Sequence, residues 1–285
     1  MHFLGIDAGA TGTQWALINQ GGLVCSGSAA AMDGHIYRPA SKKRMEEVLL
    51  EISNQVKSFG VTGAFMGITG VTSDGSIEIL AEKILGVPIR VVSDIELAYR
   101  ANFPKDRGIL LYAGTGSVAF TIDDQLVPHQ IGGWGYLLGD EGAGYWIGRE
   151  AIRHALSEIE SKIQPIPGSL AYGILDVIGG NNWDSVKTFV YSQERSAIAS
   201  LANQVETFAK GGEVNALKIL TRSAAELAYL VKRMDNSLEN ILLPVIFTGG
   251  ISKSTIVFKE IEKIIPGRVA VSNIDIATRA AQLAI

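Results

Sequence analysis

Two glycine-rich turns in this chain carry residue types that can hold a phosphorylated ligand. One reads Asp-Ala-Gly-Ala-Thr-Gly-Thr over residues 7–13, and the other reads Ala-Gly-Thr-Gly-Ser over residues 113–117. Apolar runs flank both turns, which predicts a β-hairpin at each. Glycine lets a ligand approach the backbone closely, and the N–H and hydroxyl groups of such turns can donate to phosphate oxygens. Either turn alone is more typical of an ordinary hairpin, but two matched copies favour phosphate binding.

The two turns differ in charge. The first contains a carboxylate, Asp7, and the second contains none. A carboxylate can hold a cation, whereas a neutral turn can hold phosphate oxygens without repelling them. The first turn can therefore hold a cation while the second holds phosphate oxygens.

The elements around the turns follow one plan twice. In the first half we expect strands at residues 2–6, 15–18, 23–28, 64–69 and 88–93, with helices at 41–59, 77–85 and 95–102. In the second half we expect strands at 108–113, 117–122, 125–131, 241–247 and 268–272, with helices after residue 144, within 165–210, around 217–231, and at 252–265 and 276–285. Each half is thus three antiparallel strands followed by alternating helices and parallel strands. Ser41 is the expected N-cap of the first helix.

This repeat predicts an α/β fold of two domains, residues 1–107 and 108–285, with a ligand in the crevice between them. A length of 285 residues suits two domains, and a hydrophobic content of 47% can build a core in each. A net charge of −4 and a single basic trio at residues 42–44 argue against a nucleic-acid partner. No signal peptide and no apolar run of about 18 residues is visible, so we expect a cytoplasmic protein without a membrane partner.

The cysteine and histidine content excludes several kinds of site. The one cysteine, Cys25, cannot form an intrachain disulfide, a cysteine-based zinc site or a self-contained iron–sulfur cluster. The four histidines show no metal-ligand spacing. Each histidine is therefore more often structural than catalytic.

Two further features carry carboxylates. Asp94 stands where a predicted strand joins a predicted helix, a position that also suits a helix N-cap. Residues 132–144 read Gly-Gly-Trp-Gly-Tyr-Leu-Leu-Gly-Asp-Glu-Gly-Ala-Gly, which is too rich in glycine for a helix. We predict an unusual loop there, with Asp140 and Glu141 side by side.

Together these motifs resemble the sugar kinase, hsp70 and actin superfamily, and within it the BadF/BadG/BcrA/BcrD ATPase family that includes N-acetylglucosamine kinases. Residues 7–13 are similar to the first phosphate motif, residues 113–117 to the second, and Phe-Thr-Gly-Gly-Ile-Ser at 247–252 to the adenosine motif. The loop at 132–144 is the most specific match. The resemblance covers nearly the whole chain and implies two actin-like, ribonuclease H-like domains with the nucleotide in the interdomain cleft. It leaves open whether the last helix, about residues 274–285, packs back on the first domain.

The resemblance also implies an activity, the ATP-dependent phosphorylation of an amino sugar, with ATP and Mg²⁺ as cofactors. Asp94 is the implied general base and Asp7 the implied metal residue. The implied nucleotide contacts are Gly9, Thr11, Gly12, Thr13, Gly114, Thr115, Gly116, Gly249, Gly250 and Ser252. The implied sugar contacts are His35, Asp94, Gly133, Trp134, Gly135 and Asp140. For Trp134, anchoring the loop in the core is an equally weighted alternative.

Two positions depart from the family pattern. The first substrate loop usually carries an Asn-His pair, but residues 32–35 read Met-Asp-Gly-His. The last helix commonly carries a Gly-Ala pair, but this chain has Arg279 and Ala280.

Two other classes share these motifs. The ATPase activators of radical dehydratases hold a cluster between two subunits with two cysteines from each, which Cys25 alone cannot supply. An actin-like assembly protein would have no evident use for the loop at 132–144. An ATPase of the BadF/BcrA type without sugar kinase activity is the alternative that we retain. The sugar, the phosphorylated hydroxyl and the choice between monomer and homodimer stay open.

Overall fold

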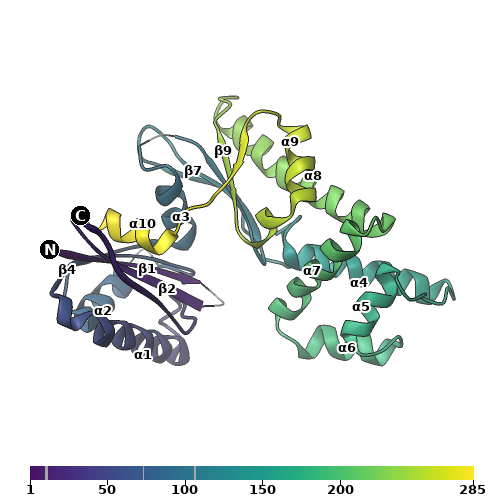
Figure 1. Cartoon of the computed structure of the whole chain (residues 1–285), viewed down its shortest axis with the longest axis horizontal. Helices are drawn as coiled ribbons and strands as arrows, with labels where there is room; N and C mark the ends of the chain where they lie inside the picture. The colour runs from purple at the N-terminus through teal and green to yellow at the C-terminus, as the bar shows by residue number, and fades with distance from the viewer. Residues whose placement is uncertain (10–11, 73, 106) are drawn as a thin grey trace. The chain divides into compact units, whose positions relative to one another are not determined.

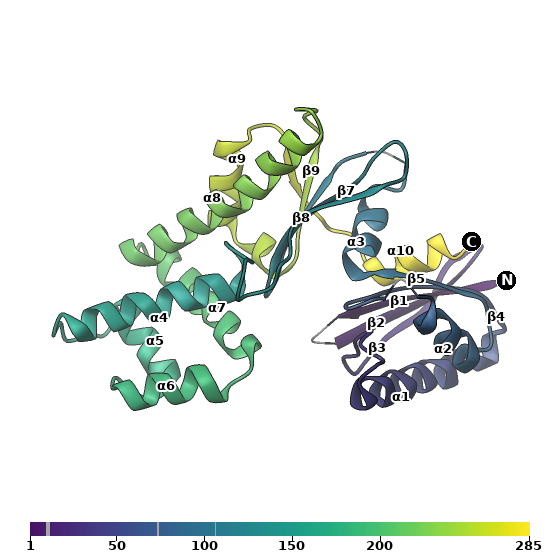
Figure 2. The same ribbon diagram turned by 180° about the vertical axis from the view of Figure 1, so that it is seen from behind.

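The chain forms two compact α/β units, each built on a five-stranded mixed sheet (Figures 1 and 2). A computed structural model describes residues 1–285 apart from residues 10, 11, 73 and 106. Unit 1 comprises Met1–Asp106 with Asn273–Ile285, and unit 2 comprises Arg107–Ser272. The C-terminal segment, which the sequence repeat assigned to the second domain, therefore belongs to unit 1.

Unit 1 contains five strands and four α-helices in its described residues. In chain order they are β1 His2–Gly9, β2 Gly12–Asn19, β3 Gly22–Ala29, α1 Pro39–Val56, η1 Lys57–Phe59, β4 Val61–Ile68, α2 Ser76–Leu85, β5 Ile89–Ser93, α3 Asp94–Asn102 and, from the C-terminus, α10 Ile276–Leu283.

Unit 2 repeats the strand plan with a larger set of helices. Its elements are β6 Ile109–Ala113, β7 Ser117–Ile122, β8 Pro128–Gly132, α4 Gly144–Glu160, α5 Leu170–Ile178, α6 Trp183–Ser192, α7 Arg195–Lys210, α8 Val214–Ser237, β9 Val245–Thr248, η2 Gly250–Lys253, α9 Thr255–Ile264 and β10 Val269–Val271.

The two sheets have the same topology. The strand order is β3-β2-β1-β4-β5 in unit 1, and in unit 2 it is β8-β7-β6-β9-β10. In each sheet the first three strands are antiparallel, and the last two run parallel to the central strand, β1 or β6. The sequence repeat is therefore a repeat of sheet topology.

Helices cover both faces of the unit 1 sheet, with α1 and α2 on one side and α3 and α10 on the other (Figure 1). Side chains alternate between the faces of a strand. Leu4 and Ile6 of β1 accordingly belong to the core that contains Leu49 of α1. The intervening Gly5 faces α10, where an added Cβ would lie 2.1 Å from the carbonyl oxygen of Ala277. The absence of a side chain at Gly5 lets the last helix lie directly on the sheet.

Arg279 and Ala280, which depart from the family pattern, do not disturb this packing. Ala280 is fully buried in the small core that it shares with Phe65 and Leu97. The Arg279 guanidinium donates a hydrogen bond to the side chain of Gln282 on the same helix.

The helices of unit 2 share one core with its sheet. Ile109, Leu111 and Phe247 are fully buried in this core. They pack with the apolar faces of α4, α5, α7 and α8, the last of which is 24 residues long. Burial of this many apolar side chains is the main stabilising contribution.

Several predicted boundaries were wrong for local reasons. The α1 helix begins at Pro39, whose fixed φ suits the first helical position, and its N-cap residue is Arg38 rather than Ser41. The β9 strand begins at Val245 rather than at residue 241, since Pro244 has no N–H to donate to a sheet. Within residues 1–9, 12–72, 74–105 and 107–285, no helix combines the length and apolarity that crossing a bilayer would need.

Candidate active site

Asp7 and Asp94 lie at the same edge of the unit 1 sheet, because three parallel strands end there. Asp7 on β1 is the register partner of Gly67 on β4. Ile68 of β4 pairs in turn with Ser93, the last residue of β5, and Asp94 follows directly. The carboxyl ends of parallel strands are the edge at which open α/β sheets bind ligands.

Hydrogen bonds fix the Asp94 carboxylate. It accepts one from the backbone N–H of Ile95 at 2.9 Å and another from the Thr69 hydroxyl. Burial raises the pKa of Asp94, and these hydrogen bonds offset part of the rise. The carboxylate is therefore oriented, and it is a stronger base than an exposed aspartate.

The N-cap of α3 is Ser93, not Asp94. The Ser93 hydroxyl accepts a hydrogen bond from the backbone N–H of Glu96 at 3.1 Å, and Asp94 is the first helical residue. The capping role that competed with catalysis for Asp94 is thus filled by its neighbour.

Asp7 is a half-buried carboxylate close to other carboxylates. Burial, followed by the negative charges of Asp94 and Asp275, raises its pKa from 3.8 to about 6. Asp275 is the N-cap of α10 and accepts a hydrogen bond from the backbone N–H of Thr278 at 2.6 Å. Such a concentration of negative charge favours a bound cation.

The residues present fit a magnesium ion that is shared with phosphate oxygens. In the described part of the chain, no three His, Cys, Asp or Glu side chains are grouped so that they could hold a metal. Mg²⁺ usually keeps several waters and uses one or two carboxylates plus substrate phosphates. Asp7, flanked by Asp94, matches that donor set, and its metal role stays a prediction.

His35 lies beside the same sheet edge. Its Nδ1 and the Asp33 Oδ1 are 2.8 Å apart, and its ring lies so close to Gly70 that an added Cβ there would be 2.6 Å from it. The backbone N–H of Gly34 donates to the carbonyl of Thr69 at 2.8 Å. The loop that carries His35 is therefore attached to the residue that orients Asp94.

The first glycine-rich turn is described only in part. Thr11 lies outside the described residues. Gly9 and Gly12 pair with each other at the ends of β1 and β2. Thr13 is fully buried and its hydroxyl donates to the Ala30 carbonyl at 2.8 Å, so this hydroxyl is engaged within the protein.

The second turn is held by the start of α4. The backbone N–H of Gly144 donates to the Gly114 carbonyl at 2.8 Å, and that of Tyr145 donates to the Thr115 carbonyl at 3.2 Å. Thr115 itself is exposed. Its side chain is thus available to a ligand.

Asp140 lies directly against this turn. Its Oδ1 accepts a hydrogen bond from the backbone N–H of Ser117 at 3.2 Å, and an added Cβ on Gly116 would be 2.5 Å from its Oδ2. Asp140 has a left-handed backbone with φ of 62°. Burial raises its pKa, the Ser117 hydrogen bond lowers it, and the charges of Glu141 and Arg195 act in opposite directions.

The loop before Asp140 presents apolar side chains to solvent. Trp134 is 72% exposed, and Leu137 and Leu138 are 80% and 79% exposed. The core-anchor alternative for Trp134 was therefore wrong. Gly133 and Gly135 flank it with positive φ angles of 72° and 83°.

The adenosine motif adjoins the second turn. An added Cβ on Gly249 would be 2.5 Å from the carbonyl oxygen of Ala113, and the φ of Gly249 is 93°. The Ser252 hydroxyl donates to the Gly249 carbonyl at 2.8 Å, which closes the motif on itself. Gly250 is exposed and has open space around it.

The BadF/BadG/BcrA/BcrD ATPase family matches residues 4–281. The chain belongs to this family. Membership of an ATPase family implies the use of ATP, and the motifs described above are the parts of the chain suited to it.

Characterised relatives of this ATPase-family chain are amino sugar kinases. The N-acetylmuramic acid/N-acetylglucosamine kinase of Clostridium acetobutylicum is 30% identical over 167 residues, which are 57% of this chain and 54% of the relative. The match thus spans about half of that protein's length. The N-acetyl-D-glucosamine kinase of Dictyostelium discoideum is 23% identical over 87% of this chain and 84% of its own.

Solved structures show the same fold. A Chromobacterium violaceum protein provisionally named as an N-acetylglucosamine kinase superposes with a TM-score of 0.81 at 21% identity, over 99% of this chain and 98% of its own. A ROK family glucokinase from Streptomyces griseus gives a TM-score of 0.60 at 16% identity, over 100% of this chain and 99% of its own. The fold of this ATPase-family member is the two-domain, actin-like α/β fold that the sequence resemblance predicted.

Three residues of the site were missed from the sequence. Thr69 is the last residue of the strand predicted at residues 64–69, at the carboxyl end where open α/β sheets bind ligands, so it could have been singled out. Asp275 precedes the last helix and is recognisable as an N-cap, but its closeness to Asp7 depends on the chain returning to unit 1. Arg195 is far from Asp140 in sequence, and no local signal indicates that its charge lowers the pKa of Asp140.

Proposed function

We propose that this protein transfers the γ-phosphoryl group of ATP to a hydroxyl of an amino sugar such as N-acetylglucosamine or glucosamine. The observation that carries the proposal is the half-buried, hydrogen-bonded Asp94 carboxylate beside Asp7, in a family whose characterised relatives include N-acetylglucosamine kinases. An oriented carboxylate with a raised pKa is the group that deprotonation of a sugar hydroxyl requires.

Asp94 acts in this proposal as the general base. Its carboxylate accepts the proton of the attacking sugar hydroxyl, while Thr69 and the Ile95 N–H hold the carboxylate in one orientation. Because burial raises the pKa of Asp94, its affinity for that proton exceeds that of an exposed aspartate. General-base catalysis of this kind contributes about 10² to 10⁴ in rate.

Asp7 supplies the metal site. When bound, Mg²⁺ supplies neutralisation of charge on the phosphate oxygens. Above its pKa of about 6 the Asp7 carboxylate is charged, and it would hold that cation against the repulsion from Asp94 and Asp275. Loss of the Asp7 charge removes the cation site without removing any contact to the sugar.

The nucleotide contacts come from the two turns and the adenosine motif. We assign phosphate contacts to the backbone of Gly9 and Gly12, to Thr11, and to Gly114, Thr115 and Gly116. The Thr13 and Ser252 hydroxyls are engaged within the protein, so these two residues contribute through their backbone N–H groups or through packing. Gly249 and Gly250 contribute a turn that leaves the adenosine motif open at Gly250.

The sugar contacts are assigned to His35, Asp94, Gly133, Trp134, Gly135 and Asp140. His35 is oriented by Asp33, and the exposed face of Trp134 is a surface on which a sugar ring can stack. Residues 32–35 contain no Asn, so the amide that the family uses in this loop is absent, and the Met32 side chain is 1% exposed and packs in the core. We infer that His35 carries more of the sugar recognition in this chain.

The test is a coupled assay of ADP release over a panel of hexoses, hexosamines, N-acetylglucosamine and N-acetylmuramic acid. We expect ADP release to rise at least tenfold with an amino sugar over the sugar-free rate, with a phosphorylated sugar as the product. ATP turnover that no sugar changes would instead support an ATPase of the BadF/BcrA type without sugar kinase activity. A response to hexoses alone would contradict the assigned substrate class.

A further inference from the structure

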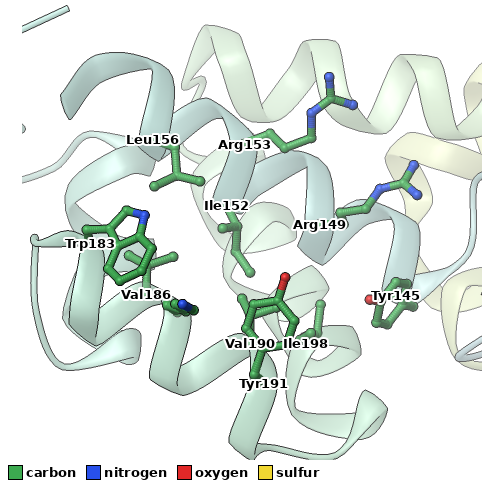
Figure 3. A pocket seen from close by; sticks show the side chains of 11 residues that line it. Tyr145, Arg149, Ile152, Arg153, Leu156, Trp183, Val186, Val190, Tyr191 and Ile198 are labelled. Carbon is green, nitrogen blue, oxygen red and sulfur yellow. The ribbon is translucent and has the colours of Figure 1, made fainter. Parts of the chain in front are cut away.

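A pocket on the helical part of unit 2 has no part in the proposed phosphoryl transfer. It lies among α4, α6 and α7 and has a volume of about 470 Å³ (Figure 3). Pockets that hold small molecules are typically about 300 to 1,000 Å³. This one is therefore large enough for a ligand of its own.

The floor of the pocket is apolar. It is formed by Ile152 and Leu156 of α4, Val186 and Val190 of α6, and Ile198 of α7. The α6 helix adds two exposed aromatic rings, Trp183 at 67% and Tyr191 at 81% exposure. Exposed rings over an apolar floor can enclose an apolar or aromatic ligand body.

The polar part of the lining is positively charged. Arg149 and Arg153 line the pocket from α4, as Figure 3 shows, and Lys187 lines it from α6. Among the described residues, the lining includes no Asp or Glu. The Lys187 ammonium lies 4.1 Å from the centre of the Trp183 ring, which keeps a cation beside the aromatic surface.

The neighbouring carboxylate does not neutralise this charge. Glu150 is 7% exposed and is shared by three guanidinium groups, those of Arg149 at 3.4 Å, Arg153 at 3.1 Å and Arg222 at 3.2 Å. One negative charge therefore faces three positive ones. The Nε of Arg149 is also buried without a hydrogen-bond partner. The pocket thus combines an apolar interior with a surplus of hydrogen-bond donors and positive charge.

We propose that this pocket binds a small organic anion with an apolar body, such as an aryl or acyl carboxylate or sulfonate. Arg153 and Lys187 attract the anionic group, and the floor and Trp183 enclose the apolar body. Arginine is well suited to the acidic group because its planar donors match a carboxylate. The site is independent of the proposed kinase activity, since none of its lining residues belongs to the assigned nucleotide or sugar contacts.

The test uses two fluorescent probes of similar shape on the full chain, without ATP or sugar. One probe, 1-anilinonaphthalene-8-sulfonate, is an anion, and the other, N-phenyl-1-naphthylamine, is neutral. We expect saturable binding of one sulfonate probe per chain, and an affinity for it about tenfold above that for the neutral probe, the scale of one charge-assisted hydrogen bond. The double variant Arg153→Gln with Lys187→Gln should remove this difference while leaving neutral-probe binding unchanged.

Arg222→Gln is the matched control. It removes a guanidinium from the same Glu150 carboxylate, but Arg222 does not line the pocket. We expect Arg222→Gln to leave the affinity for both probes within about twofold. Equal binding of the two probes by the unmodified chain would overturn the proposal, and so would an equal loss in the control and the double variant. The probe affinities of the unmodified chain and of the variants can be interpreted whether or not the chain phosphorylates a sugar.

Discussion

The Asp140 carboxylate accepts a hydrogen bond from the backbone N–H of Ser117 at 3.2 Å, which joins the loop at residues 132–144 to the end of the second glycine-rich turn. A second bond closes the same junction, since the Ser117 hydroxyl donates to the Glu141 carbonyl at 2.8 Å. The loop assigned to the sugar and the turn assigned to ATP phosphates are therefore one connected structure. A change in either should affect both ligands.

We predict that Asp140→Asn weakens sugar recognition but keeps the fold. Asparagine tolerates the left-handed backbone at this position, so the melting temperature should stay nearly constant. Loss of the charged acceptor should raise KM for the sugar about tenfold, the scale of one hydrogen bond to a charged group. Steady-state kinetics with calorimetry would measure both. The control is Glu141→Gln, which alters the exposed neighbour; an equal effect of the two variants would speak against a specific role for Asp140.

The adenosine motif offers a matched pair of glycine variants. Gly249→Ala forces a side chain into a backbone conformation with φ of 93° and against the Ala113 backbone, so it should lower the free energy of unfolding by about 2 kcal/mol. Gly250→Ala meets nothing within 4 Å and should stay within about 0.5 kcal/mol of the unmodified protein. Urea denaturation would measure both values. Similar stabilities for the two variants would contradict the described turn.

The raised pKa of Asp7 predicts that the stability of the metal-free protein depends on pH. This pKa is about 6 in the folded state and 3.8 in the reference state, so between these values the folded chain binds the extra proton. The contribution of Asp7 to stability is therefore full below pH 3.8 and is lost as the pH rises through 6. With a chelator present, Asp7→Asn should raise stability at pH 7 by on the order of 3 kcal/mol and change little at pH 4.

The same variant should lose function as it gains stability. Without the Asp7 charge, magnesium-dependent turnover should fall sharply, while calorimetric sugar affinity stays near that of the unmodified protein. A variant that loses sugar affinity but keeps its magnesium dependence would show that Asp7 has been misassigned. Equal stability of the variant and the unmodified chain at pH 7 would contradict the raised pKa.

Helices and strands were predicted well wherever the apolar pattern and the flanking turn or glycine indicated the same boundaries. The β7 strand was predicted at its observed residues, because residues 117–122 are mostly apolar and lie between two turns. The α2 helix ends before Gly86, whose left-handed backbone terminates it as expected. The matching order of the two sheets follows from the repeat of turns and strands.

Features that depend on distant parts of the chain were beyond sequence reasoning. The position of Asp140 over Gly116 requires a left-handed aspartate that its sequence neighbours do not specify. The family resemblance left open whether α10 returns to unit 1, because that return depends on the close approach permitted at Gly5, far away in sequence. The apolar character of Trp134 suggested burial as one alternative, yet its side chain is exposed, as functional loops often are.

The central claim is that Asp94 is the base in phosphoryl transfer to an amino sugar, and the kcat of Asp94→Asn tests it most directly. Because Ser93 caps α3, the substitution should leave the melting temperature nearly unchanged, and ATP binding should persist. An amide cannot accept the sugar proton, so kcat on the best amino sugar should fall by about 10² to 10⁴. A folded variant that keeps more than about a third of the kcat of the unmodified protein would contradict the account, given the loss that a general base should cause.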